Sequence, residues 1–204
     1  LAMSRPPEKL YDFIVVTKED KYLGTVTIKD LLQKTTEIEV VNAKYQNPLS
    51  GLPGNLIIEQ KMKQFICDES PYCILYFDID NFKAYNDVYG FENGDLIIKL
   101  LADLIVTFLP KGQFAGHVGG DDFVVILSNH EGASLCGMII NEFDKEILQY
   151  YNPQDIQNGY IIAEDRHGAI EKFPLISLSI AGINNKIYQF GNVYELTEEL
   201  AKIK

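Results

Sequence analysis

The feature that most constrains the fold is a pair of glycines between two short apolar runs. Residues 119–120, both glycine, separate the runs at residues 113–118 and 123–127. Glycine accepts positive φ angles without steric penalty, so this pattern predicts a tight hairpin turn. Asp121 and Asp122 follow the pair directly, and two like charges among apolar residues repel each other. The hairpin therefore predicts a bound cation, which a second group of carboxylates elsewhere in the chain should share.

Composition and charge exclude several classes of protein. The 204 residues are 47% hydrophobic and 23% charged, as in a globular chain of one large domain, or one domain plus a fragment. The net charge of −11 argues against a nucleic-acid partner. It leaves room for a small anionic ligand, because a bound divalent metal reverses the local sign of charge.

The location of the protein is predicted from what the sequence lacks. No apolar stretch reaches the roughly 20 residues of a membrane span, and no signal peptide opens the chain. The three cysteines are an odd number without the spacing of a zinc site, which fits free thiols in a reducing compartment. We therefore expect a cytoplasmic protein without a membrane span.

The chain is predicted to contain two domains, at residues 1–45 and 46–204. The first domain is predicted to begin with a lead-in at residues 1–9, followed by strands at 13–17 and 22–27. A short helix at 28–34 and a linker helix at 37–46 come next. Such a unit is too small to bury a core alone. The chain starts at a leucine and ends in what reads as an unfinished helix. We therefore expect a piece of a longer protein, cut within the second domain.

The second domain alternates apolar strands with amphipathic helices. Its predicted helices lie at residues 56–66 (capped by Asn55), 95–109, 131–149 and from 192 onward, with a short one after residue 81. Its predicted strands lie at residues 72–79, on both sides of the Gly-Gly turn, and at 175–180. An extra hairpin is predicted from residues 160–163 and 172–176, with its turn at 166–168. Residues 152–158 are predicted as a loop. This order predicts an α+β fold with helices packed on a mixed sheet.

The second group of carboxylates is Asp78 and Asp80, at the end of a buried strand. Residues two apart on a strand share one face, and the N–H groups of residues 81–83 would open the next helix towards an anion. The alternative is that Asp80 only caps that helix and Asp78 only ends the strand. A calcium-binding EF-hand loop is excluded, because Lys83 and Tyr89 stand where it needs glycine and glutamate.

Taken in order, these motifs resemble the GGDEF family, the diguanylate cyclases. The matching segments are Phe77-Asp78-Ile79-Asp80-Asn81-Phe82-Lys83, Asn86-Asp87, Gly90, Gly94-Asp95 and Gly119-Gly120-Asp121-Asp122-Phe123. Residues 47–55 are similar to the family's D-x-L-T-G-L-x-N segment, and residues 177–181 to its late strand. The resemblance covers residue 46 to the end. It implies a five-stranded, mainly antiparallel sheet ringed by helices, as in nucleotide cyclases and polymerase palms.

The N-terminal part resembles a different family. Residues 23–27, Leu-Gly-Thr-Val-Thr, are similar to the closing half of a CBS module, in which a hairpin leads into a helix. Only half a module is present, so a complete ligand site is not expected there.

The GGDEF resemblance implies a binding role for each motif. Asp78 and Asp121 would hold one or two Mg²⁺ (or Mn²⁺) ions with the backbone carbonyl of Ile79. Asn86 and Asp95 would read the edge of a guanine base. Oxygen-only ligands suit these metals, and an amide beside a carboxylate suits guanine.

The same resemblance implies the chemistry. Lys83 and the N–H groups of Asn81 and Phe82 would contact phosphates, with Asp121 and Asp122 as the catalytic carboxylates. A ribose 3′-hydroxyl would attack the α-phosphate of a second GTP. Because each domain holds one GTP, two domains must face each other, which implies a transient homodimer.

The sequence departs from the family pattern at several positions. Asp122 replaces the usual glutamate, His117 an arginine and Phe91 a histidine. The Arg-x-x-Asp motif of product inhibition would fall on residues 110–113 and is absent, so we expect no inhibition at that site. The family's terminal Lys/Arg motif is not recognisable in residues 194–204.

Two functional hypotheses follow from these departures. The first is a Mg²⁺-dependent diguanylate cyclase. Slow turnover is compatible with it, since a misplacement of about 1 Å can cost on the order of 100-fold in rate. The second is a GTP-binding regulatory domain without turnover, which would control a linked cyclic-di-GMP phosphodiesterase or another output domain.

Overall fold

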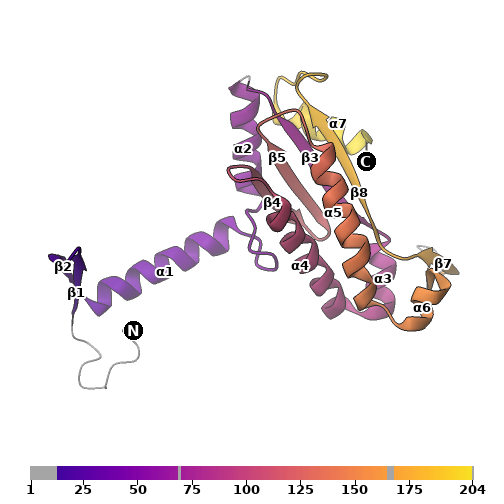
Figure 1. The fold of residues 1–204 in the computed structure, drawn as a ribbon, viewed down its shortest axis with the longest axis horizontal. Coiled ribbons are helices and arrows are strands. Elements are labelled where there is room, and N and C mark those ends of the chain that lie inside the picture. The colour runs from indigo at the N-terminus through magenta and orange to yellow at the C-terminus, as the bar shows by residue number, and fades with distance from the viewer. Residues whose placement is uncertain (1–12, 69, 165–167, 204) are drawn as a thin grey trace. The chain divides into compact units, whose positions relative to one another are not determined.

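A computed structural model describes residues 13–68, 70–164 and 168–203 (Figure 1). The chain divides into two compact units, Leu1–Lys44 and Tyr45–Lys204, and each is described separately. The predicted lead-in at residues 1–9, and Arg166 and His167 of the predicted turn, lie outside the described residues.

The first unit is a hairpin followed by one long helix. Strands β1 (Ile14–Lys18) and β2 (Lys21–Val26) pair antiparallel, and helix α1 (Ile28–Tyr45) follows. Thr27 caps α1, because its Oγ1 accepts a hydrogen bond from the N–H of Asp30 at 3.0 Å. No side chain of residues 13–41 is buried, as the small size of this unit leads one to expect.

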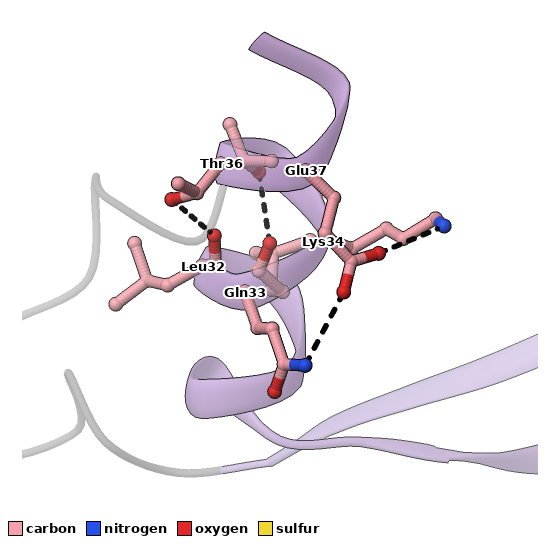
Figure 2. A network of polar contacts seen from close by, with 7 residues as sticks. Leu32, Gln33, Lys34, Thr36 and Glu37 are labelled. Carbon is pink, nitrogen blue, oxygen red and sulfur yellow. Dashed lines mark hydrogen bonds and ion pairs between the residues drawn. The ribbon is translucent and has the colours of Figure 1, made fainter. Parts of the chain in front are cut away.

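Helix α1 corrects the prediction of two separate helices at 28–34 and 37–46. Thr35 and Thr36, at the expected break, donate their hydroxyls to the carbonyls of Leu31 and Leu32 at 2.8 and 3.0 Å. On another side of the same turn, Glu37 pairs with Lys34 at 3.1 Å and accepts a hydrogen bond from Gln33 at 3.2 Å (Figure 2). These local bonds keep the polar residues inside the helix.

The second unit is built on an antiparallel sheet of four strands in the order β4-β5-β3-β8. These strands are β3 (Cys73–Asp80), β4 (Phe114–Gly119), β5 (Asp122–Leu127) and β8 (Ser177–Asn184). The α+β fold with a mainly antiparallel sheet is confirmed, and every described pairing in this sheet is antiparallel. The sheet has four strands rather than the five expected.

The extra hairpin forms a sheet of its own. Strands β6 (Tyr160–Glu164) and β7 (Ile170–Pro174) pair with each other and do not extend the main sheet. Pro174 ends β7, and it has no N–H to donate to a further ladder. The predicted hairpin is therefore present, at slightly shifted bounds.

Helices cover both faces of the main sheet (Figure 1). Along β3 the side chains alternate, so that Leu75 and Phe77 join one core and Ile74 joins the other. Helices α3 (Phe82–Tyr89), α4 (Phe91–Phe108) and α5 (Ala133–Glu146) pack on the first face, and α2 (Asn55–Cys67) and α7 (Val193–Ile203) on the second.

Three helix boundaries differ from prediction. Helix α2 has Gly54 at its N-cap rather than Asn55, which is its first residue. Helix α4 begins at Phe91 instead of residue 95, because Gly90 takes a φ of 84° and lets the chain enter a new helix at once. The predicted helix at 131–149 is α5 followed by a 3₁₀ turn at Ile147–Tyr150.

The segment predicted as a loop at 152–158 contains a helix. This helix, α6 (Pro153–Asn158), has proline in its first turn. Asn152 caps it by accepting a hydrogen bond from the N–H of Asp155 at 2.8 Å.

No helix in the described parts of the chain is both long enough and apolar enough to cross a membrane.

Candidate functional site

Two adjoining hollows lie where strands β3 and β4 meet the following loops and helices. The first has a volume of about 680 Å³ and the second about 510 Å³. They share Phe82, Lys83, Asp87 and Asp121. Asp121 therefore links both hollows, directly after the glycine turn.

The second hollow gathers the residues predicted to bind metal. It is lined by Asp78, Ile79 and Asp121, together with Asn81 and Lys83. No group of three or more His, Cys, Asp or Glu side chains among the described residues is placed to hold a metal ion by itself. Two carboxylates and a carbonyl still fit Mg²⁺, which takes one or two carboxylates and completes its shell with water and substrate phosphates.

Asp80 lies apart from this group. Its carboxylate accepts hydrogen bonds from Ser177 at 2.8 Å and from Ser179 at 2.8 and 2.9 Å, both on β8. It does not cap α3, whose N-cap is Asn81 in the left-handed conformation with a φ of 61°. Asp80 thus links two strands, and Asp78 is the aspartate of this pair that reaches the hollows.

The first hollow holds the residues predicted to bind a base. Asn86 on α3 and Asp95 on α4 both line it. The Oδ1 atom of Asn86 is buried and is the one such side-chain atom without a hydrogen-bond partner among the described residues. A buried polar atom of this kind is normally satisfied, so its lack of a partner calls for an explanation.

Gly94 makes room for that amide. A Cβ atom at this position would lie 1.9 Å from Asn86 Oδ1 and 3.2 Å from Cζ of Phe82. Only glycine fits here without moving its neighbours. The missing side chain at Gly94 therefore leaves the space that the Asn86 amide oxygen occupies.

His117 of β4 lies beneath the glycine turn. It is 1% exposed, and its ring stacks on Phe123 with centroids 4.1 Å apart. Its Nδ1 is 2.8 Å from Oγ of Ser50, and its Nε2 is 2.9 Å from the carbonyl oxygen of Gly120. Burial lowers the pKa of His117, although the Gly120 carbonyl and the charge of Asp122 partly oppose that shift.

Asp121 and Asp122 have different surroundings. Asp121 lines both hollows, whereas Asp122 is the first residue of β5, pairs with Gly119 and lines neither hollow. The structure therefore brings Asp78, Asp95 and Asp121 to one place and leaves Asp122 beside it.

Three tyrosine rings, two of them on helix α3, pack against one another. Tyr85 and Tyr89 of α3 stack with centroids 4.7 Å apart, and Tyr151 meets both rings edge-on. Tyr85 donates its hydroxyl to the carbonyl of Tyr150 at 2.8 Å, and Tyr89 donates to Asp155. Burial raises the pKa of Tyr151 to about 12, so the cluster stays neutral.

Some residues at the site carried no functional prediction. Glu164 and Phe173 of the extra hairpin line the second hollow, and Asn47 and Leu49 line the first. The last two belong to the segment similar to D-x-L-T-G-L-x-N, which was a usable signal. Nothing local in the hairpin sequence indicated its place at the site.

Comparison with known proteins shows the family of this chain. Residues 45–168, more than half of the chain, match the family described as "Diguanylate cyclase, GGDEF domain". The bifunctional diguanylate cyclase/cyclic di-GMP phosphodiesterase MucR of Pseudomonas aeruginosa is 30% identical over 117 residues, which are 55% of this chain and 17% of MucR. The diguanylate cyclase DgcP of Escherichia coli is 28% identical over 125 residues, which are 59% of this chain and 36% of DgcP.

A solved structure shares the fold. The GGDEF domain of DgcB from Caulobacter crescentus, in complex with c-di-GMP, aligns with a TM-score of 0.54 and 21% identity, covering 78% of this chain and 86% of that one. The chain matches only about a sixth of MucR and a third of DgcP. By the match to the family across its second unit, the chain belongs to the GGDEF diguanylate cyclase family.

Proposed function

We propose that this chain binds GTP with Mg²⁺ or Mn²⁺ in the two hollows and condenses two GTP molecules into cyclic-di-GMP and pyrophosphate. The observation that carries the proposal is the place of Asp121. It lines both hollows, and so connects the end that holds Asn86 and Asp95 with the end that holds Asp78. The names of MucR and DgcP, both diguanylate cyclases, support the same reaction.

The first hollow would take the guanine base. The Asn86 amide would donate to O6, and the Asp95 carboxylate would accept from N1–H and N2–H. Asn86 and Asp95 both line the first hollow, which supports this assignment. Phe82 lines the same hollow and would contact the nucleotide from its side.

The second hollow would take the phosphates and the metal. Lys83 and the free N–H groups at the start of α3, next to Asn81, would bind phosphate oxygens. Asp78, Asp121 and the carbonyl of Ile79 would hold the metal, which lowers the pKa of the attacking hydroxyl and neutralises charge on the leaving group.

The reaction forms one bond and breaks another. The ribose 3′-oxygen of one GTP bonds to the α-phosphorus of the second, and the bond from that phosphorus to the β-phosphate bridge breaks. Pyrophosphate leaves with the electron pair, and a carboxylate of the pair at 121–122 takes the hydroxyl proton. Two such steps close the ring, so two copies of the domain must meet in a transient homodimer.

A second candidate function is GTP binding without turnover. Asp122 is one methylene shorter than the family's usual glutamate, and it lines neither hollow. The chain would then regulate a linked output domain such as a cyclic-di-GMP phosphodiesterase. The name of MucR, which joins both activities in one protein, supports such a setting.

The test is to incubate the purified chain with GTP and Mg²⁺ and to follow both bound GTP and cyclic-di-GMP. We expect GTP to bind and product to form. Asp95→Ala should weaken GTP binding by roughly 10- to 100-fold, because hydrogen bonds to a charged group are worth about 1.5–3 kcal/mol each. Asp103→Ala is the matched control, because Asp103 lies exposed on the same helix and outside both hollows.

Three outcomes separate the candidates. The cyclase is supported if product forms, and if Asp95→Ala reduces its formation while Asp103→Ala does not. GTP binding with the same dependence but no product supports the regulatory domain. A chain that binds no GTP in the presence of Mg²⁺ contradicts both.

The remaining parts of the proposal concern the setting of the domain. We propose a domain boundary near residue 45, a first unit that is the end of a CBS-like module, and a cytoplasmic location. The hairpin β1–β2 leading into α1 has the order of elements expected for such a module half.

A further inference from the structure

The side chain of His117 bridges two turns that are far apart in the sequence. One is the opening turn, residues 47–54, which contains Ser50; the other is the glycine turn at Gly119–Gly120. The backbone N–H of His117 also donates to the carbonyl of Pro53 at 2.8 Å. Strand β4 is therefore fixed to the opening turn by both the main chain and the side chain of one residue.

The two ring contacts define how the imidazole is protonated. A carbonyl oxygen can only accept, so Nε2 must carry the hydrogen that it donates to Gly120. Nδ1 of the neutral ring then accepts from the hydroxyl of Ser50, whose oxygen also accepts from the N–H of Leu52 at 3.3 Å. Both ring nitrogens are satisfied in one neutral tautomer.

The glycine turn is held by the pairing of Gly119 with Asp122 and by the hydrogen bond from His117, and its two glycines have room around them. A Cβ atom added at Gly119 or Gly120 would meet nothing within 4 Å. Both residues have positive φ angles, 148° and 58°, and glycine has the widest conformational freedom of any residue. The hydrogen bond from His117 therefore restrains the peptide that joins Gly120 to Asp121.

We propose that His117 is a positioning residue, which holds the Gly120 carbonyl so that the Asp121 carboxylate faces the two hollows. The inference rests on the proposed function, because it assigns Asp121 to metal and nucleotide.

The experiment compares two conservative variants of the full chain. In His117→Gln the amide nitrogen stands as far along the side chain as Nε2 and can still donate to Gly120. In His117→Asn the amide stands near the place of Nδ1, so it can keep the bond to Ser50 but not the bond to Gly120. Both variants are polar and neutral. Glutamine keeps the bond to Gly120 and gives up the bond to Ser50, and asparagine does the reverse, so the readouts at the glycine turn report on the Gly120 bond. His117→Leu, which makes neither bond, replaces the asparagine variant if that one does not fold.

Two readouts apply. The first is the gain in GTP affinity when Mg²⁺ is added. We expect His117→Asn to reduce this gain roughly tenfold, as the loss of a single hydrogen bond implies. His117→Gln should keep the gain within about threefold of that of the unchanged chain. The second is amide hydrogen exchange at residues 119–122 without nucleotide, which should speed up in the asparagine variant and stay unchanged in the glutamine variant.

The outcomes distinguish this inference from the proposed function. Equal behaviour of the two variants, in both the Mg²⁺ gain and the exchange, overturns the positioning role and makes His117 a packing residue. If the unchanged chain binds no GTP, the proposed function fails, and the exchange comparison alone then decides whether His117 restrains the turn.

Discussion

At the scale of single residues, the packing of Asn86 against Gly94 leaves no room for a larger residue at position 94. The amide oxygen of Asn86 occupies the space that any side chain at position 94 would need. A larger residue must push this amide away, and the ring of Phe82, with Cζ 3.2 Å from the added Cβ, must also give slightly.

We expect Gly94→Ala to weaken GTP binding by about tenfold, because it displaces a side chain worth roughly one hydrogen bond to the base. Gly137→Ala on α5 is the control, because a Cβ there would meet nothing within 4 Å. That substitution should leave binding unchanged and stabilise the helix by about 0.5–1 kcal/mol. Titration with GTP and thermal unfolding of both variants check this, and unchanged GTP binding by Gly94→Ala would contradict the assignment of Asn86.

His117 also makes stability depend on pH. Burial lowers its pKa in the folded chain below the ordinary value of 6.5. Above that value the residue is neutral in both states and adds no pH dependence. As the pH falls below it, the unfolded chain takes up a proton that the folded chain refuses, so stability is lost until the folded pKa is passed.

The stability difference between the unchanged chain and His117→Gln should therefore shrink as the pH falls from about 7.5 towards 5.5, across the ordinary histidine pKa of about 6.5. Urea unfolding at several pH values measures it. Because the acidic groups are common to both proteins, their titration cancels in the difference. If the stability difference between the two proteins is the same at every pH, the fold does not hold His117 neutral.

At the scale of elements, hydrophobic periodicity and turn residues predicted those helices, strands and turns that the local sequence determines. The apolar run at 72–79 and the Gly-Gly turn have their expected structure in β3 and in the β4–β5 hairpin. The failures have two kinds of cause. The helix at Pro153–Asn158 had a local signal, an asparagine before a proline, that pointed to a cap as well as to a loop.

The number of strands depended on contacts that no local pattern contains. Whether β6 and β7 extend the main sheet or pair alone is decided by which partner each finds in space. The same holds at the site. Motifs indicated Asp78, Asn86, Asp95 and Asp121, whereas the contact of Ser50 with His117 joins residues 67 apart in the sequence. The chemical roles of these residues stay predictions until they are measured.

At the scale of the whole molecule, the second unit should fold without the first. The fragment 45–204 contains both cores, and we expect it to unfold cooperatively and bind GTP as the full chain does. The shorter fragment 45–168 covers the family match but lacks β8 and α7, which supply Ala181, Ile183, Leu196 and Leu200 to the second core. It should not fold. Circular dichroism during urea unfolding tests both, and a stable, GTP-binding 45–168 fragment would show that β8 is dispensable.

The pairing of β3 with β8 also delays the completion of the main sheet during synthesis of the chain. Cys73 faces Asn184, so the chain must grow by a further 111 residues (184 − 73) before that partner exists. At synthesis rates of roughly 5–20 residues per second, this takes about 6–20 s. Throughout that interval one edge of an apolar central strand leaves the ribosome without its neighbour, and its unpaired backbone groups are open to a wrong strand.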